Sequence, residues 1–204
     1  MAALAPTDLV IRVLENIGRV SGDRQCPSAA IIRRGDDEYR RLRRRLSAEF
    51  PTIYEKLSSS TTLTTLTTIA KPTDCETIRV MEKQSGAYWT SLPLAPSLNR
   101  DEIGCLAFYE EGANVVIVPS GSAPGTYRMF YIAAPASTVT TYDVPDGMEG
   151  IIIEEVSAWA RQRHEEDPSY HKSCAKQIWD DQYMALWNRY GSHGATGLQV
   201  TRVW

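Results

Sequence analysis

Two side chains near the C-terminal end of this sequence have types and spacing that could bind a metal ion. His171 and Cys174 lie three residues apart, so a helix would place them on one face. Asp167 or His164 could add a further ligand. The sequence offers no second ligand pair at a recognisable spacing. We therefore expect no metal site.

Residues that could support catalysis are also few. The loop at 119–125 (PSGSAPG) has neither the lysine of a phosphate-binding loop nor the strand-to-helix setting of a nucleophilic serine. Three pairs of adjacent glutamates occur, but neighbours in sequence point in different directions on a helix and favour a solvated face. These pairs are Glu110/Glu111, Glu154/Glu155 and Glu165/Glu166. We expect no catalytic residue and no cofactor, and hence no enzyme.

Charge is the strongest local signal. Between residues 33 and 49, seven arginines and four acids leave a net charge of about +3. From Asp143 to Asp167, eight acids and two arginines give about −6. The two segments are complementary, and two interpretations stay open. The charges could pair within one subunit, or the arginines could bind another protein or phosphate groups. The candidate interface residues are Arg40, Arg41, Arg43, Arg44, Arg45, Glu154 and Glu155.

Hydrophobic periodicity predicts which elements carry these charges. Apolar residues at three- and four-residue steps indicate a helix over 7–20, which Gly22 should stop, and a second from Ser28 to Phe50, which Pro51 ends. Residues 53–57 (IYEKL) could add one more turn. Further helices are predicted after Pro145 and after Asp167–Pro168, with Gly191 as a C-cap.

The middle of the chain is predicted to be β-rich, because β-branched and aromatic residues form short runs there between Gly, Pro and Asn. Strands are expected near 63–69, 77–82, 87–92, 105–110, 115–118 and 126–132. Turns are expected at 84–86 and 111–114, and the second turn should close a hairpin.

These elements predict an α+β fold. The N- and C-terminal helices should pack as a small bundle, with an inserted antiparallel β subdomain. The expected boundaries are 1–57 and 144–191 for the helices, 58–143 for the β insertion and 192–204 for a C-terminal tail. We expect the tail to bind a partner, because it ends in apolar residues that could anchor it. These are Leu198, Val200, Val203 and Trp204.

Bulk composition is that of a globular chain. It has 204 residues, is 43% hydrophobic and has a formal net charge of −3. Four scattered cysteines favour reduced thiols over a disulfide scaffold. No apolar run approaches the roughly 20 residues of a membrane span, and Asp8 interrupts any signal-peptide core. We expect a soluble protein that is not secreted and does not bind membranes.

A series of loose motifs resembles a family of phage proteins. It comprises Lys71-Pro72-Thr73-Asp74, Ile78-Arg79-Val80, Gly86-Ala87-Tyr88, Ala107 to Gly112, Ile117-Val118-Pro119-Ser120, Thr126 to Pro135 and Val144 to Glu149. In this order the motifs resemble the head-to-tail adaptors of tailed bacteriophages, also called tail tubular or head-completion proteins. The resemblance spans roughly residues 60 to 190.

The resemblance implies a virion structural protein of the neck, assembled in the host cytoplasm. Such adaptors form a cyclic ring, often of twelve copies, that joins the portal protein to the tail tube or nozzle protein. Double-stranded DNA passes through the channel without its sequence being read. Another neck role, stopper or tail terminator, remains an alternative. A DNA-binding protein that uses the arginine-rich helix is a more distant one.

Overall fold

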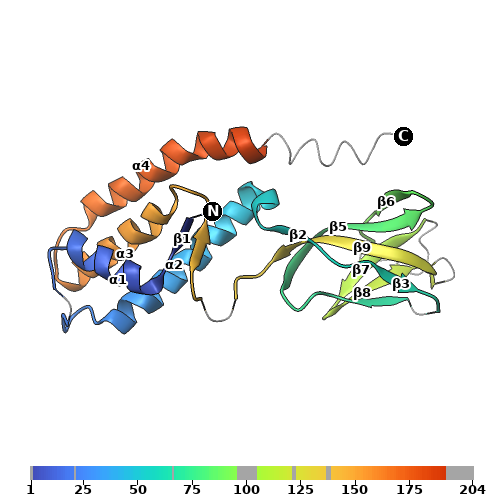
Figure 1. The fold of residues 1–204 in the computed structure, drawn as a ribbon, viewed down its shortest axis with the longest axis horizontal. Helices are drawn as coiled ribbons and strands as arrows, with labels where there is room; N and C mark the ends of the chain where they lie inside the picture. The colour runs from blue at the N-terminus through green and yellow to red at the C-terminus, as the bar shows by residue number, and fades with distance from the viewer. Residues whose placement is uncertain are drawn as a thin grey trace. The chain divides into compact units, whose positions relative to one another are not determined.

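The computed structural model describes residues 2–20, 22–65, 67–95, 105–120, 123–136 and 139–191 (Figure 1). Contacts divide the chain into a helical unit, built from residues up to Ile53 and from Pro135 onward, and a β unit from Tyr54 to Ala134. The second boundary lies nine residues before the expected 143/144, because residues 142–144 form a strand of the helical unit. The α+β class is confirmed.

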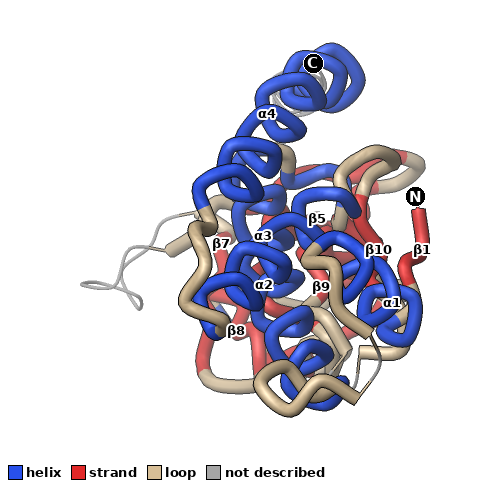
Figure 2. The backbone as a smooth tube through the Cα atoms, turned by 90° about the vertical axis from the view of Figure 1, so that its left-hand side faces the viewer, coloured by secondary structure: helices blue, strands red, loops and turns tan. Residues whose placement is uncertain are grey.

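Where the structure describes the helical unit, it contains four α-helices, and α3 is at their centre. They are α1 (Pro6–Asn16), α2 (Ser28–Glu49), α3 (Glu149–Arg163) and α4 (Ser169–Leu186), followed by a π-helical turn at Trp187–Gly191. α1, α2 and α4 all pack against α3, which lies between α1 and α4 in both views (Figures 1 and 2). Accordingly, α3 buries side chains on most of its circumference, including Ile152 and Val156.

A two-stranded sheet that the sequence did not predict completes this unit. β1 (Ala2–Leu4) pairs antiparallel with β10 (Tyr142–Val144). Tyr142 is fully buried and its hydroxyl donates to Asp36 Oδ1 over 3.0 Å. Burial, together with that hydrogen bond, raises the pKa of Tyr142. α2 can approach this ring closely because position 35 is glycine: a Cβ there would lie 2.8 Å from Tyr142 Oη and would collide with Leu9.

The described residues of the β unit form eight strands in two antiparallel sheets. They are β2 (Glu55–Leu57), β3 (Thr61–Leu63), β4 (Thr68–Ala70), β5 (Cys75–Ser85), β6 (Tyr88–Leu92), β7 (Ala107–Glu111), β8 (Asn114–Val118) and β9 (Gly125–Ala133). One sheet has the order β2-β9-β5-β6, with β3 also on β9, and the other has β4-β8-β7. Inward residues of both sheets, such as Met81, Ile117 and Tyr127, share one buried core.

The outer face of the larger sheet carries an arginine held by aromatic rings. Arg128 Nε lies 2.6 Å from Glu82 Oε2, and that glutamate is only 5% exposed. The guanidinium also lies over Trp89, at 4.2 Å from the ring centroid, and over Phe130 at 5.4 Å. Arg128 is therefore the ion-pair partner of a buried carboxylate on this sheet.

Three local predictions were wrong, each for a definable reason. Residues 55–57 form β2 rather than a helical turn, because they pair with β9. The expected strand at 63–69 is two strands, β3 and β4, in different sheets. The first helix ends at Asn16, before the expected stop, because Gly18 adopts φ +67° and Arg19 N–H donates to Leu14 O over 2.8 Å. The predicted hairpin, β7–β8, is confirmed, and the turn expected at 84–86 joins the antiparallel pair β5–β6.

Candidate functional site: a groove between α2 and α4

A groove in the helical unit runs between α2 and α4 over the face of α3, and encloses about 500 Å³. The helices line it because each turns part of a charged face and part of its apolar stripe toward it. Its lining residues are Glu38, Arg41, Leu42 and Arg45 from α2, Ile151, Ile152 and Glu155 from α3, and Lys172, Ala175, Lys176, Trp179 and Asp180 from α4. The floor is apolar and the rims are charged.

A buried carboxylate organises the α2 wall. Glu38 is 5% exposed and lies 2.5 Å from Arg34 Nη2 and 2.8 Å from Arg41 Nε. Arg41 also reaches across the groove floor, where its Nη2 lies 3.1 Å from Glu155 Oε1 on α3. One guanidinium therefore satisfies two acids and joins two helices. This arrangement holds the groups in place and leaves no free acid–base pair on this wall.

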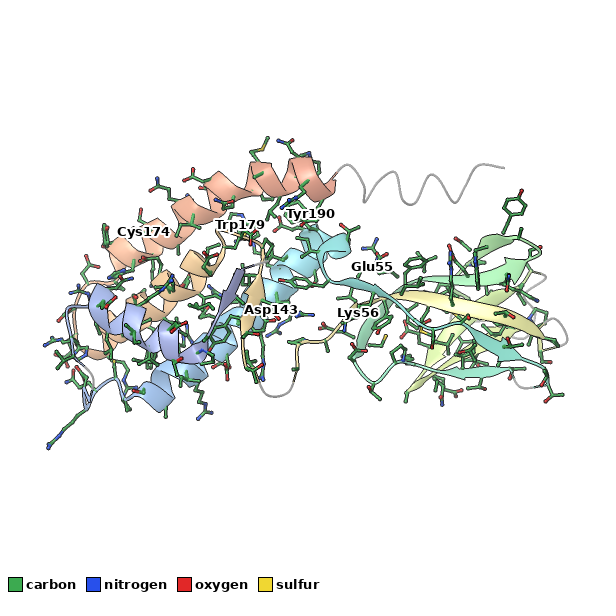
Figure 3. All side chains as sticks on the ribbon, in the orientation of Figure 1. Glu55, Lys56, Asp143, Cys174, Trp179 and Tyr190 are labelled. Carbon is green, nitrogen blue, oxygen red and sulfur yellow. The ribbon has the colours of Figure 1, made fainter. Side chains whose placement is uncertain are left out.

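The α4 wall presents an aromatic ring beneath a second guanidinium. Trp179, labelled in Figure 3, is 7% exposed, and Arg45 Cζ lies 3.3 Å from its ring centroid. Arg45 Nε is also 3.1 Å from Glu49 Oε1. A guanidinium over an indole ring is a favourable cation–π contact. The Arg45 guanidinium, held between Trp179 and Glu49, therefore forms part of the groove lining.

The outer rim of α4 differs from the α2 wall, because its charges are exposed. Lys172, Lys176 and Asp180 follow one another at four-residue steps and lie beside the buried stripe of Ala175 and Trp179. The charge of Lys172 helps to lower the pKa of Asp167, whereas Lys176 and Asp180 form no close ion pair with another described side chain. The rim therefore presents exposed charges that can pair with an external partner.

The structure brings together three of the predicted interface residues: Arg41, Arg45 and Glu155 all line the groove. Arg40, Arg43 and Arg44 do not line it. Arg43 Nη1 donates to the Tyr39 hydroxyl over 3.0 Å, and Arg44 Nε donates to the Arg40 carbonyl over 3.3 Å.

Glu154, the other predicted acid, lies outside the groove. Its Oε2 is 2.6 Å from His171 Nδ1 and its Oε1 accepts from Asn16 Nδ2 over 3.3 Å. Of the two interpretations left open for these charges, Arg41 and Glu155 follow the first: they form an ion pair within one subunit. The predicted tail residues Leu198, Val200, Val203 and Trp204 lie outside the described part of the chain.

Sequence reasoning missed Lys172, Lys176 and Asp180, and placed Trp179 only in an apolar stripe. The four-residue spacing of the three charges is visible in the sequence, but their position beside a groove depends on how α2 and α4 flank α3. The arrangement is suited to binding a protein segment: an apolar side chain can enter the floor while charges pair along the rim.

Among the residues with described placement, no three His, Cys, Asp or Glu side chains gather closely enough to hold a metal ion. Within the same ranges, no helix is long and apolar enough to cross a membrane. Comparison with protein-family models and with curated proteins finds no match.

Proposed function

We propose that this chain is a ring-forming structural subunit of the neck of a tailed bacteriophage, an adaptor that joins the portal to the tail around a DNA channel. The observation that carries the proposal is the groove between α2 and α4. Its apolar floor and the exposed charges of Lys172, Lys176 and Asp180 provide a surface for another protein chain. A ring subunit needs such a surface on every copy.

The resemblance supports the same proposal, because its motifs coincide with structural elements. The motif from Ala107 to Gly112 forms β7 and its turn into β8, and the motif from Thr126 to Pro135 forms most of β9, the strand that pairs with three others. Pro145 and Asp146 directly precede α3. These motifs therefore specify the β unit and the start of the central helix.

The arginine-rich helix α2 has a different role from the one its charge suggests. Arg34 and Arg41 neutralise Glu38, and Arg45 is held between Glu49 and Trp179. These guanidinium groups are already paired within the subunit. Such pairing argues against a continuous phosphate-binding surface along α2, the alternative in which this helix binds DNA.

The proposal is tested by sedimentation of the purified chain with the portal protein of the same phage, at low and high salt, followed by negative-stain imaging. We expect several copies on each portal, arranged as a ring. A single copy per portal, or none, would contradict the proposal. A salt-dependent shift of labelled duplex DNA without portal binding would instead support the DNA-binding alternative.

A further inference from the structure

The larger sheet of the β unit ends on both sides in a strand with an open edge. Among the described residues, β6 pairs only with β5 and β2 pairs only with β9 (Figure 1). The smaller sheet differs, because residues 93–95 lie along β7: the Ala95 N–H donates to Phe108 O over 2.6 Å, and the Phe108 N–H donates to Pro93 O over 3.1 Å. An open edge presents unpaired N–H and C=O groups to which another chain can add a strand.

The turn between β5 and β6 decides which backbone groups β6 presents at its edge. This turn has two residues, so the residues that flank it, Ser85 and Tyr88, form a hydrogen-bonded pair. Hydrogen-bonded and non-hydrogen-bonded pairs alternate along antiparallel strands, so the N–H and C=O groups of Trp89 and Ser91 point away from β5. The side chains of Trp89 and Ser91 lie on the outer face of the sheet, which also carries Arg128.

The opposite edge, on β2, presents matching groups. The Ser58 N–H donates to Met129 O on β9 over 2.9 Å. By the same alternation, the N–H and C=O groups of Glu55 and Leu57 point away from β9. Leu57 lies directly opposite Phe130 on the outer face, and its side chain is 50% exposed.

Two copies side by side would bring these edges together in a definite direction and register. Each step in the order β2-β9-β5-β6 is antiparallel, so β6 and β2 run in opposite directions. Neighbouring copies in a ring have nearly the same orientation, so β6 of one copy meets β2 of the next as an antiparallel neighbour. Outer-face residues then lie opposite one another. The register that uses both edge pairs places Trp89 opposite Leu57 and Ser91 opposite Glu55.

The side chains of this register fit one another. Trp89 and Leu57 would form an aromatic–aliphatic cross-strand pair, which covers the exposed leucine. The Ser91 hydroxyl oxygen is buried and has no hydrogen-bond partner within the described part of the chain. Burial raises the pKa of the Glu55 carboxyl group, so a hydroxyl donor from the next copy would favour its ionised form. A shift by two residues would lose one of these two pairs.

We infer that β6 of one copy adds to the β2 edge of a second copy of this chain, so that the larger sheet continues from subunit to subunit. The inference rests on the proposed ring and names a contact that builds it. Because β6 and β2 are different edges, each added copy leaves one edge of each kind free. The contact therefore repeats until a ring closes.

Paired cysteines test the contact and its register. Thr90 and Lys56 of two copies would form a non-hydrogen-bonded pair with Cα atoms about 4.5 Å apart, which a disulfide can bridge. Within one copy these residues lie three strand spacings apart, at least about 14 Å, so only a bond between copies can form. Lys56→Cys and Thr90→Cys are made as separate chains and mixed under mild oxidation. Both carry Cys105→Ser, which removes an exposed thiol.

The mixture should give a disulfide-linked dimer, and a chain with both cysteines should give a ladder of covalent oligomers. The matched control is Tyr88→Cys mixed with Lys56→Cys. Tyr88 is exposed and lies two residues from Thr90 on the same face of β6, where the Cα distance to position 56 would be about 7–8 Å. This control should cross-link about tenfold less. Thr90→Cys alone should stay monomeric.

A proline at the edge tests whether the contact drives assembly. Ser91→Pro removes an N–H that β5 does not use, so the melting temperature should change little. The concentration needed for assembly, measured by sedimentation without and with portal, should rise about tenfold or more, because the edge loses a donor for the next copy. Ser91→Ala keeps this N–H and should assemble more nearly as the unmodified chain does.

The outcomes separate the contact from the proposed function. If the unmodified chain forms a ring on portal, but positions 56 and 90 do not cross-link and Ser91→Pro assembles normally, the contact is wrong while the proposed function stands. If Thr90→Cys alone forms dimers, two β6 edges pair with each other and the inferred contact is wrong. If the 56–90 cross-link forms in a chain that does not bind portal, the contact stands and the portal role fails. If the unmodified chain does not self-associate either alone or on portal, both fail.

Discussion

Among the residues that the structure describes, each unit buries one glutamate to a similar extent, but the ion pairs that neutralise the two glutamates differ. Glu38 in the helical unit and Glu82 in the β unit are both 5% exposed. Glu38 is paired with two arginines, Arg34 and Arg41, whose side chains are 37% and 64% exposed. Glu82 is paired with Arg128, which is 25% exposed and lies over two aromatic rings.

The number of ion-pair partners should decide how much stability is lost when one of them is removed. Removing one partner of a buried ion pair is costly mainly because it leaves the other charge buried and unpaired. Glu38 would keep a second arginine after such a loss, whereas Glu82 would lose Arg128, its ion-pair partner on β9. The helical unit should therefore tolerate changes on α2 that the β unit does not tolerate on β9.

The largest effect is expected for Arg128→Met. This change leaves Glu82 buried without its cation, so we expect it to lower the free energy of unfolding of the β unit by about 3 kcal/mol. Urea unfolding, with hydrogen exchange to assign the loss to β5 and β9, measures it. Adding Glu82→Met should recover most of the lost stability. If the double variant is no more stable than the single one, the aromatic contacts of Arg128 matter more than its charge.

A packing change in the helical unit should come next. Gly35→Ala would place a Cβ against Leu9 and 2.8 Å from Tyr142 Oη. Overpacking costs about 1–3 kcal/mol, partly offset by alanine's better helix propensity of up to about 1 kcal/mol. We expect a net loss of about 1–2 kcal/mol in thermal or urea unfolding. In the background of Tyr142→Phe, where the hydroxyl is gone, the same change should cost less. An increase in stability would show that α2 is not closely packed at this position.

Arg41→Met tests whether the second arginine on Glu38 protects the helical unit against the loss of the first. Arg34 remains on Glu38, and Arg41 is well exposed, so we expect a loss of no more than about 1 kcal/mol, although two ion pairs disappear. The matched comparison is Arg128→Met, measured under the same urea conditions. A loss from Arg41→Met as large as that from Arg128→Met would mean that two partners give Glu38 no protection.

The smallest effect concerns the surface pair of the β unit. A hydrogen bond from Lys56, 2.7 Å from Asp74 Oδ2, holds the pKa of Asp74 below its ordinary value, and the Tyr131 hydroxyl contributes. A lowered pKa in the folded state stabilises the protein above the ordinary aspartate value of about 3.9 and is lost as the pH falls through the folded value. Lys56→Met should thus cost under about 1 kcal/mol at neutral pH.

The stability lost in Lys56→Met should depend on pH, because the ion pair exists only while Asp74 is ionised. Unfolding measured from pH 7 down to pH 2.5 should show the difference between Lys56→Met and the unmodified chain shrinking as Asp74 becomes protonated. In the background of Asp74→Asn the difference should be small at every pH. A difference that stays constant over this range would mean that Lys56 acts through packing and not through charge.

The sequence predicts the parts of this fold that depend on local pattern. Apolar residues at three- and four-residue steps predicted four helices, and turn residues predicted one turn at 84–86 and the hairpin at 111–114. Gly86 and Gly112 in these turns have positive φ. What it could not predict depends on distant partners. β1 and β10 are three residues each and about 140 residues apart, so neither carries a strand signal of its own. Residues 55–57 become a strand only because β9 pairs with them.

The candidate site shows the same division. Charge density singled out Arg41, Arg45 and Glu155, which line the groove, but composition could not tell whether they pair within one copy or between copies. That depends on the packing of α2 and α3. Three charges on a helix are ordinary, so the sequence offered no reason to select Lys172, Lys176 and Asp180. Their position in the groove lining is visible only in the structure.

The central claim, that the chain forms a ring on the portal, is tested most directly by the mass of the complex. Native mass spectrometry of portal rings saturated with this 22.8 kDa chain counts the bound copies. The account predicts one species that carries a full ring of copies, twelve by the resemblance, with no populated lower occupancy at saturation. Portal rings that carry a single copy, or that bind none at all, would contradict it.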